Sequence, residues 1–201
     1  FMRTKLPFTV LKYAMTLDGK TATVLGKSQW ITGEAARKRV HEDRGRYMAI
    51  LTGVSTVLAD NPQLTCRIPG GKNPIRVIAD TKLRTPLSST VVQTARETPT
   101  WIVTAVSDAG RKKAYEDAGC RVLSVPAKEG ELDLQAMMQR LGEEKVDSVM
   151  VESGGTLAWS FLKAGLVNRV QAYIAPKIFG GAGARPGEGN RCGCAAGGIS
   201  S

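Results

Sequence analysis

One stretch of the sequence combines residue types that could bind a phosphate. The apolar run from Ser148 to Val151 predicts a buried strand, which breaks at Glu152-Ser153-Gly154-Gly155. Apolar residues from Thr156 to Leu166 then recur at helical spacing. A strand, a glycine turn and a helix N-terminus aim free backbone N–H groups at one point, where a phosphate or pyrophosphate commonly binds. An ordinary tight turn with an exposed Glu152 fits the same residues, because a Gly-Gly turn is a weak signal.

Two charged residues, Glu152 and Lys12, lie at the end of or within predicted apolar strands. Glu152 directly follows its strand, so we expect it at the carboxyl edge of the sheet, where open α/β sheets bind ligands. Lys12 lies inside a second strand-like stretch, Leu6 to Met15. A lysine in an apolar strand either reaches solvent from the sheet edge or points into a site. The residues alone leave both possibilities open for Lys12.

The elements that must position these residues alternate along the chain. Alternating strands and helices predict one α/β domain, with a mostly parallel central sheet flanked by helices. Besides the two strands already named, strands are expected at 48–51, 75–79, 100–104, 121–125 and 170–175, and helices at 34–46, 107–118 and 132–141, with a short helical turn after Gly53.

Composition narrows the classes of function. The 201 residues, 42% of them hydrophobic, can build one core, and no run approaches the roughly 20 apolar residues that cross a bilayer. A net charge of +10 suits nucleic acid or phosphorylated small molecules. Nucleic acid is disfavoured because only 5% of residues are aromatic and no nucleic-acid-binding motif is recognisable. The four cysteines form no Cys-x-x-Cys pair, so a reducing, cytoplasmic setting without a disulfide scaffold is expected.

The end of the chain differs from the rest. The stretch from Gly180 to Ser201 is rich in Gly, Ala, Arg and Cys and has almost no large apolar side chain. Such a segment cannot bury enough surface to order itself, so the domain is expected to span 1–183 and 184–201 to be a disordered tail. Cys192 and Cys194 have no further soft ligand nearby, and no metal site is expected.

Several segments together resemble one family. They are similar, in unbroken order over residues 6–183, to the reductase domain of the bifunctional riboflavin-biosynthesis deaminase/reductase. The other half of such proteins, a zinc deaminase with His-x-Glu and Pro-Cys-x-x-Cys, has no counterpart here, and neither do the strand-forming segments that follow Gly181 in the family. The sheet is therefore expected to lack its C-terminal strands. The matching segments are KYAMTLDGK at 12–20, SQWIT at 28–32, AILTG at 49–53, TVLADNPQLT at 56–65 with Arg67, PIRVIAD at 74–80, VESGG at 151–155 and YIAPK at 173–177.

This resemblance implies a dihydrofolate-reductase-like fold and an NADPH-dependent reductase. The substrate would be 5-amino-6-(5-phosphoribosylamino)uracil, whose ribose, opened to an imine, accepts hydride at C1′. A homodimer and a fused or separate deaminase domain are also implied. Positions that match NADPH contacts are Ala14, Trp30, Thr56, Asp60, Thr81 and the turn from Gly154 to Ser160, which includes Gly155, Thr156 and Leu157. Positions that match substrate contacts are Lys12, Ser28, Arg44, Leu64, Arg67 and Glu152.

The residue types at these positions suit hydride transfer, which needs orientation more than acid or base groups. The guanidinium groups of Arg44 and Arg67 match phosphate oxygens, although both residues could instead form surface ion pairs. Lys12 and Glu152 are the catalytic candidates, because they could bind ribose hydroxyls or help to protonate the imine nitrogen.

Three other positions have simpler explanations. Trp30 could be an ordinary core residue, and Asp60 could only cap the turn at Asn61-Pro62. His41, the only histidine, is assigned to the charged face of a helix and is not expected to be catalytic.

Two other functions stay open beside the pyrimidine reductase. One is an NADPH reductase of the same fold for a pterin or related heterocycle, and the other is a truncated domain that binds nucleotide without turnover.

Overall fold

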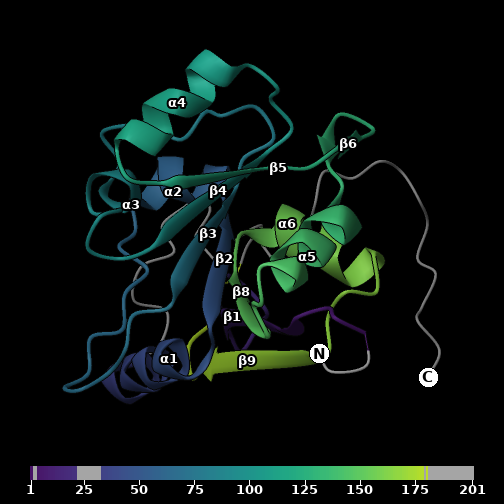
Figure 1. Ribbon diagram of the computed structural model, residues 1–201. Helices are drawn as coiled ribbons and strands as arrows, with labels where there is room; N and C mark the ends of the chain where they lie inside the picture. Colours follow the sequence, from purple (N-terminus) through teal and green to yellow (C-terminus); the bar gives the residue numbers. More distant parts are fainter. Residues whose placement is uncertain (2–3, 22–32, 179, 181–201) are drawn as a thin grey trace.

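A seven-stranded sheet forms the centre of the molecule (Figure 1). The computed structural model describes residues 1, 4–21, 33–178 and 180. Every neighbouring pair of strands in this sheet runs parallel, in the order β5-β4-β3-β2-β8-β1-β9. The strands are β1 (Phe8–Thr16), β2 (Ala49–Gly53), β3 (Ile75–Ala79), β4 (Thr100–Thr104), β5 (Arg121–Ser124), β8 (Ser148–Glu152) and β9 (Arg169–Ala175).

Six helices are described, and they cover the two faces of the sheet in separate groups (Figure 1). They are α1 (Glu34–Arg46), α2 (Val54–Asp60), α3 (Thr90–Gln93), α4 (Ala109–Asp117), α5 (Leu134–Glu143) and α6 (Gly155–Lys163). On one face, α5 and α6 pack Met137, Met138 and Phe161 against Leu11, Leu51 and Val151. On the other, side chains of α2, α3 and α4 join Val10, Ile50 and Met150 in a second core. Because successive residues of a strand point to opposite faces, each buried strand contributes to both cores.

The parallel α/β architecture expected from the sequence is confirmed. The helix expected at 34–46 has those bounds, and the other long elements differ at their ends by a few residues. Two features were not predicted: helix α3, and a short antiparallel ribbon of β6 (Ala127–Lys128) and β7 (Glu131–Leu132). Both are shorter than the windows in which hydrophobic periodicity can be recognised.

Strand β8 (148–152) enters the sheet between β2 (49–53) and β1 (8–16), although it is distant from both in the sequence. Its insertion brings Glu152 into register with Lys12 of β1. Strand β9 pairs with the other side of β1 and forms one edge of the described sheet, where Val170 and Ile174 are about half exposed. The segment 184–201 lies outside the described residues, so its predicted disorder and the predicted lack of C-terminal strands stay predictions.

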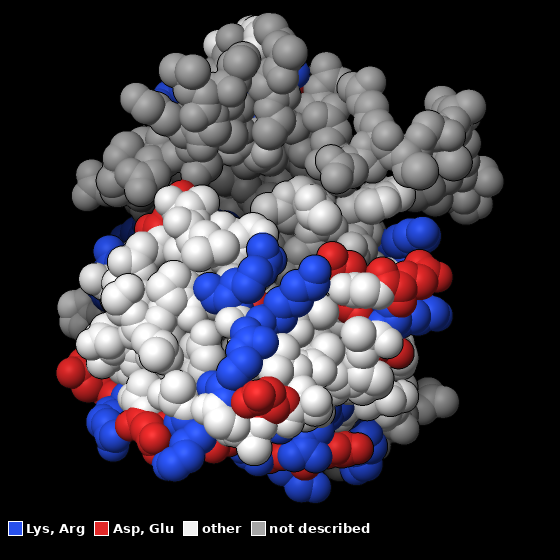
Figure 2. All heavy atoms as spheres, turned by 90° about the horizontal axis from the view of Figure 1, so that it is seen from above, with Lys and Arg blue, Asp and Glu red and all other residues white. Residues whose placement is uncertain are grey.

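The surface around α4 carries charges of both signs. Figure 2 views the molecule from above α4 and shows Lys and Arg side chains beside Asp and Glu side chains on this face. Helix α4 contains Arg111, Lys112 and Lys113, followed by Glu116 and Asp117. Within the described part of the chain, every helix is too short or too polar to cross a membrane.

Candidate active site at the carboxyl edge of the sheet

Three charged side chains from three elements meet at the carboxyl end of β8. Glu152, the last residue of β8, accepts two hydrogen bonds from Arg44 of α1, with Arg44 Nε 2.9 Å from Oε1 and Nη2 3.0 Å from Oε2. Lys12 Nζ of β1 donates to the same Oε2 at 3.3 Å. All three side chains are largely buried, between 11% and 15% exposed. The structure thus brings together three of the residues predicted to hold the substrate.

This arrangement keeps Glu152 ionised. Burial alone would raise the pKa of its carboxyl, but Lys12 and Arg44 outweigh that effect and hold the pKa at about 2. Burial likewise opposes the charge of Arg44, and the Glu152 carboxylate overcomes it and raises the pKa of Arg44. Because a carboxylate with such a pKa carries no proton near neutral pH, Glu152 is suited to orient the two cations and unsuited to donate a proton.

The loop after α2 is tied to this cluster through one backbone carbonyl. Arg44 Nη1 donates to Thr65 O at 3.3 Å, and His41 Nδ1 lies 3.2 Å from the same oxygen. Leu64 has a φ of 54° and is buried in the core, so it anchors the loop rather than lining an open site. Arg67 is exposed and forms no ion pair with a carboxylate of the described residues, which leaves its guanidinium available to an anion.

His41 lies among charged residues, as its assignment to the charged face of the helix implies, but it is only partly exposed. His41 is partly buried beside Arg44, one helical turn away, and the two share the Thr65 carbonyl. Burial and the neighbouring Arg44 and Arg67 lower the pKa of its imidazole. The spacing of three residues between His41 and Arg44 was the available signal, because it places both side chains on one helix face.

A second polar cluster supports the first and was missed in the sequence. The carboxylate of Asp43, 1% exposed, accepts from Tyr173 Oη at 2.7 Å and from Gln171 Nε2 at 2.6 Å. These bonds join α1 to β9. The Tyr173 ring centroid lies 5.9 Å from Lys12 Nζ, so the cluster also packs against the catalytic candidate.

A pocket of about 320 Å³ adjoins the charged cluster. It lies at the carboxyl ends of β2, β3 and β8, where parallel sheets bind ligands. Its lining includes six positions predicted to contact the cofactor: Thr56, Thr81, Gly154, Gly155, Thr156 and Leu157. Arg84, Glu131 and Ser153 also line it and were not predicted.

The other predicted contacts fall elsewhere. Ala14 lies on β1 and exposed Asp60 ends α2, and neither lines this pocket. Ser28 and Trp30 lie outside the described residues.

The pocket has the donors that a pyrophosphate needs. Helix α6 begins at Gly155, no side chain of the described residues caps its N–H groups, and its first turn has no acidic residue. A Cβ built on Gly154 would meet no atom of the described residues within 4 Å, which leaves room for a ligand to approach this backbone closely. The Ser153 hydroxyl is buried without a hydrogen-bond partner in the described residues. The arrangement therefore fits a dinucleotide. Because Ser153 lines the pocket and directly follows Glu152, the charged cluster lies next to the pocket.

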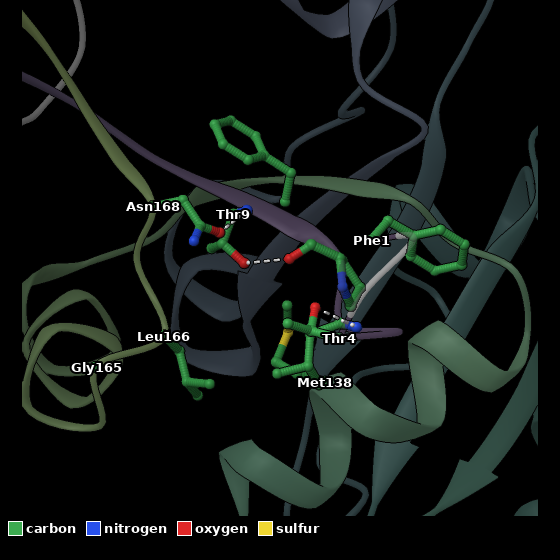
Figure 3. A pocket seen from close by; sticks show the side chains of 10 residues that line it. Phe1, Thr4, Thr9, Met138, Gly165, Leu166 and Asn168 are labelled. Carbon is green, nitrogen blue, oxygen red and sulfur yellow. Dashed lines mark hydrogen bonds between the residues drawn. The ribbon is translucent and has the colours of Figure 1, made fainter.

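A second cavity, of about 150 Å³, lies at the opposite end of the sheet (Figure 3). Phe1, Thr4, Met138 of α5 and Leu166 line it, and at its wall Thr9 N donates to Asn168 Oδ1 at 2.8 Å. None of the predicted site residues that the structure describes lines it. The candidate active site therefore lies at the carboxyl edge.

Comparisons with known proteins show the family of the chain. The family model described as the RibD C-terminal domain matches residues 7–191. The chain is 49% identical over 181 residues to riboflavin biosynthesis protein RibD of Actinobacillus pleuropneumoniae, covering 90% of this chain and 48% of that protein. It is 41% identical over 182 residues to the 2,5-diamino-6-ribosylamino-4(3H)-pyrimidinone 5′-phosphate reductase of Methanothermobacter thermautotrophicus, covering 89% of this chain and 82% of that protein.

Solved structures of riboflavin biosynthesis proteins have a similar fold. Acinetobacter baumannii RibD (form 2) superposes with a TM-score of 0.79 at 30% identity, covering 96% of this chain and 52% of that one. The riboflavin biosynthesis reductase Rib7 of Saccharomyces cerevisiae gives 0.72 at 25% identity, covering 92% and 80%. The chain spans about half the length of the RibD proteins that it matches. The chain belongs to the RibD C-terminal domain family and shares the dihydrofolate-reductase-like fold of these reductases.

Proposed function

We propose that this chain is the NADPH-dependent reductase that converts 5-amino-6-(5-phosphoribosylamino)uracil into its ribitylamino product in riboflavin biosynthesis. One observation carries the proposal: the buried Lys12–Glu152–Arg44 cluster adjoins a pocket that fits a dinucleotide. The M. thermautotrophicus relative, named as a pyrimidinone 5′-phosphate reductase, supports the same class of reaction.

The pocket residues would hold the cofactor, which supplies the hydride when bound. Backbone N–H groups from Gly155 to Leu157, at the start of α6, would bind the pyrophosphate. The Thr56 hydroxyl lines the same pocket and can donate to ribose or phosphate oxygens. The Thr81 hydroxyl donates to Glu131 and can accept a hydrogen bond from a ribose hydroxyl. The side chain of Ser153, buried without a partner, would gain a hydrogen bond.

The charged cluster would hold the substrate beside that pocket. Glu152 accepts one hydrogen bond from the Lys12 ammonium, which has two further N–H groups. These could donate to a ribose hydroxyl, or to the imine nitrogen, which gains a proton when the imine is reduced. Arg67 would bind the 5′-phosphate, because it is exposed and pairs with no carboxylate of the described residues. Arg44, already bonded to Glu152 and Thr65, would set the position of the loop that carries Arg67.

Steady-state turnover tests this proposal. The purified chain should oxidise NADPH in the presence of the phosphoribosylamino-uracil substrate, made in situ by a separate deaminase. Arg67→Ala should raise KM for the substrate, because it removes the phosphate contact, and Lys12→Met should lower kcat. Arg96→Ala, an exposed arginine that bonds Asp117 O away from the site, is the matched control. NADPH binding without turnover would show a nucleotide-binding domain instead and would contradict the proposal.

The assembly and setting are part of the proposal. A homodimer follows from the family resemblance, and light scattering of the purified chain would test it. A deaminase domain, fused or separate, is supported by the RibD relatives, which are about twice as long as this chain. A cytoplasmic, reducing setting is supported by the free thiols of Cys66 and Cys120.

A further inference from the structure

The loop that follows β3 carries one arginine to the wall of the dinucleotide pocket. Leu83 and Thr85 are buried on either side of Arg84, at 5% and 1% exposure, and Arg84 itself is exposed. Arg84 and Thr81 both line the pocket. Because its two neighbours are inserted into the protein, Arg84 is directed outward between them.

Hydrogen bonds fix this loop before any ligand binds. Asp80 Oδ2 accepts from both the backbone N and the hydroxyl of Thr85, each at 2.7 Å. Tyr115 Oη donates to Thr85 O at 2.7 Å, and Arg111 Nη2 donates to Lys82 O at 2.7 Å. The backbone on both sides of Arg84 is therefore held in place, which lowers the entropy cost of using Arg84 as a ligand.

The pocket is lined by one charged side chain of each sign, and the two differ in their partners. Among the described residues that line it, Arg84 and Glu131 are the charged ones. The Glu131 carboxylate accepts a hydrogen bond from the Thr81 hydroxyl at 3.3 Å. Arg84 forms no ion pair with any carboxylate of the described residues. The pocket thus contains a partnered carboxylate and a guanidinium that is available to an anion.

The sheet order tells which end of a dinucleotide reaches Arg84. The nicotinamide must lie near Lys12 and Glu152, at the ends of β1 and β8, to deliver hydride to the substrate. Strand β3 lies beyond β2 on the other side of β8, three strand spacings from β1, or roughly 14 Å. With the pyrophosphate at α6, the adenosine half would extend toward the β3 loop.

We propose that Arg84 binds the 2′-phosphate of the adenosine ribose and so selects NADPH over NADH. This inference rests on the proposed reductase function and assigns one residue to its cofactor specificity. In dinucleotide sites, a carboxylate on the ribose 2′-hydroxyl favours NADH, whereas a nearby arginine accommodates the 2′-phosphate. Here the carboxylate accepts a hydrogen bond from Thr81, and the arginine pairs with no carboxylate of the described residues, which favours the phosphorylated cofactor.

Binding of the two reduced cofactors to the purified chain tests the inference without turnover. Dissociation constants for NADPH and NADH would be measured by calorimetry for the wild type, Arg84→Ala, Arg84→Lys and Lys82→Ala. Arg84→Ala should weaken NADPH roughly 10- to 100-fold, as expected for losing a hydrogen bond to a charged group, and leave NADH within about twofold. Arg84→Lys should keep part of the preference, because lysine keeps the charge without the planar fork.

Lys82→Ala is the matched control, since Lys82 is an exposed cation of the same loop that does not line the pocket. It should bind both cofactors as the wild type does. An equal loss of NADPH and NADH in Arg84→Ala, or no loss of NADPH, would overturn the role of Arg84 while leaving the reductase proposal intact. A wild-type chain without preference would also overturn it. Failure of the wild type to bind either cofactor would overturn the reductase proposal as well.

Discussion

The guanidinium of Arg44 and the carboxylate of Glu152 form a bidentate ion pair between residues 108 positions apart in the sequence. The pair joins α1 to the carboxyl end of β8, and Lys12 of β1 completes it from the other side. Three elements that are distant in the sequence are therefore held together by one carboxylate. Because that carboxylate is mostly buried, its removal affects both the fold and the site.

Replacing Glu152 with glutamine should destabilise the chain and stop turnover. The substitution leaves two mostly buried cations without their counter-charge, which costs about 3 kcal/mol or more of unfolding free energy. Urea unfolding measures this cost. Glu143→Gln is the control, because Glu143 pairs with Arg140 on the surface at 66% exposure and its loss should change little. Equal stability of the two variants would show that the buried pair does not support the fold.

The same carboxylate should make the stability of the chain depend on pH in the acid range. The folded-state pKa of Glu152 is about 2, below its ordinary value of 4.5, so the unfolded chain binds the proton more readily. The stabilisation is therefore fully present above about pH 4.5 and is lost as the pH falls toward 2. Urea unfolding between these pH values should show a steeper loss for the wild type than for Glu152→Gln, and parallel curves would contradict the ion pair.

Arg76 should be essential for stability, although it lies outside the proposed site. Its side chain is fully buried in β3 and donates to the carbonyls of Gln63, Val91, Thr94 and Thr98 and to the Thr94 hydroxyl, at 2.8 to 3.2 Å. Burial lowers its pKa to about 10, so it stays charged near neutral pH. Arg76→Met removes these five hydrogen bonds, although the Thr100 hydroxyl still lies within reach of Val91 O and Thr98 O. The substitution should cost roughly 3 kcal/mol or more.

The control for that substitution is Lys113→Ala, which removes a cation at 70% exposure from a surface pair with Asp117. It should leave the urea midpoint unchanged. A small effect of Arg76→Met would mean that water or rearranged side chains replace the guanidinium.

Two glycines in helices should respond to alanine with opposite signs. Gly142 in α5 packs directly on the carbonyl oxygen of Lys5, and an added Cβ would overlap that backbone atom. Gly142→Ala should therefore lower the melting temperature, despite alanine's better helix propensity. Gly110 in α4 is exposed, and its added Cβ would make only an ordinary contact with Asp108. Gly110→Ala should raise stability by roughly 0.5–1 kcal/mol, and a rise in both variants would contradict the close packing of Lys5 on α5.

The elements could be predicted from the sequence because their signals are local. Apolar runs and helical spacing located most strands and helices, and the glycine turn after Glu152 indicated the pocket. The insertion of β8 between β2 and β1 could not be read from such patterns, because strand order depends on packing across the whole sheet. The contact between Lys12 and Glu152 was therefore visible only in the structure.

Residues missed in the sequence share a physical reason. Arg84 resembles any loop arginine until the burial of Leu83 and Thr85 shows that it is directed outward at the pocket. The Asp43–Tyr173 bond joins a helix to the last described strand, 130 residues later, and no spacing rule relates the two. Such contacts depend on tertiary packing rather than on local pattern.

Transfer of labelled hydride tests the central claim most directly. NADPH deuterated at the transferable position of nicotinamide C4 would be incubated with the purified chain and the phosphoribosylamino-uracil substrate, and the product would be examined by mass spectrometry and NMR. The account predicts deuterium on C1′ of the ribityl chain, because the cofactor pocket adjoins Lys12 and Glu152, and predicts its loss in Lys12→Met. Oxidised cofactor with no deuterium on C1′, or unreacted substrate with the wild-type chain, would contradict it.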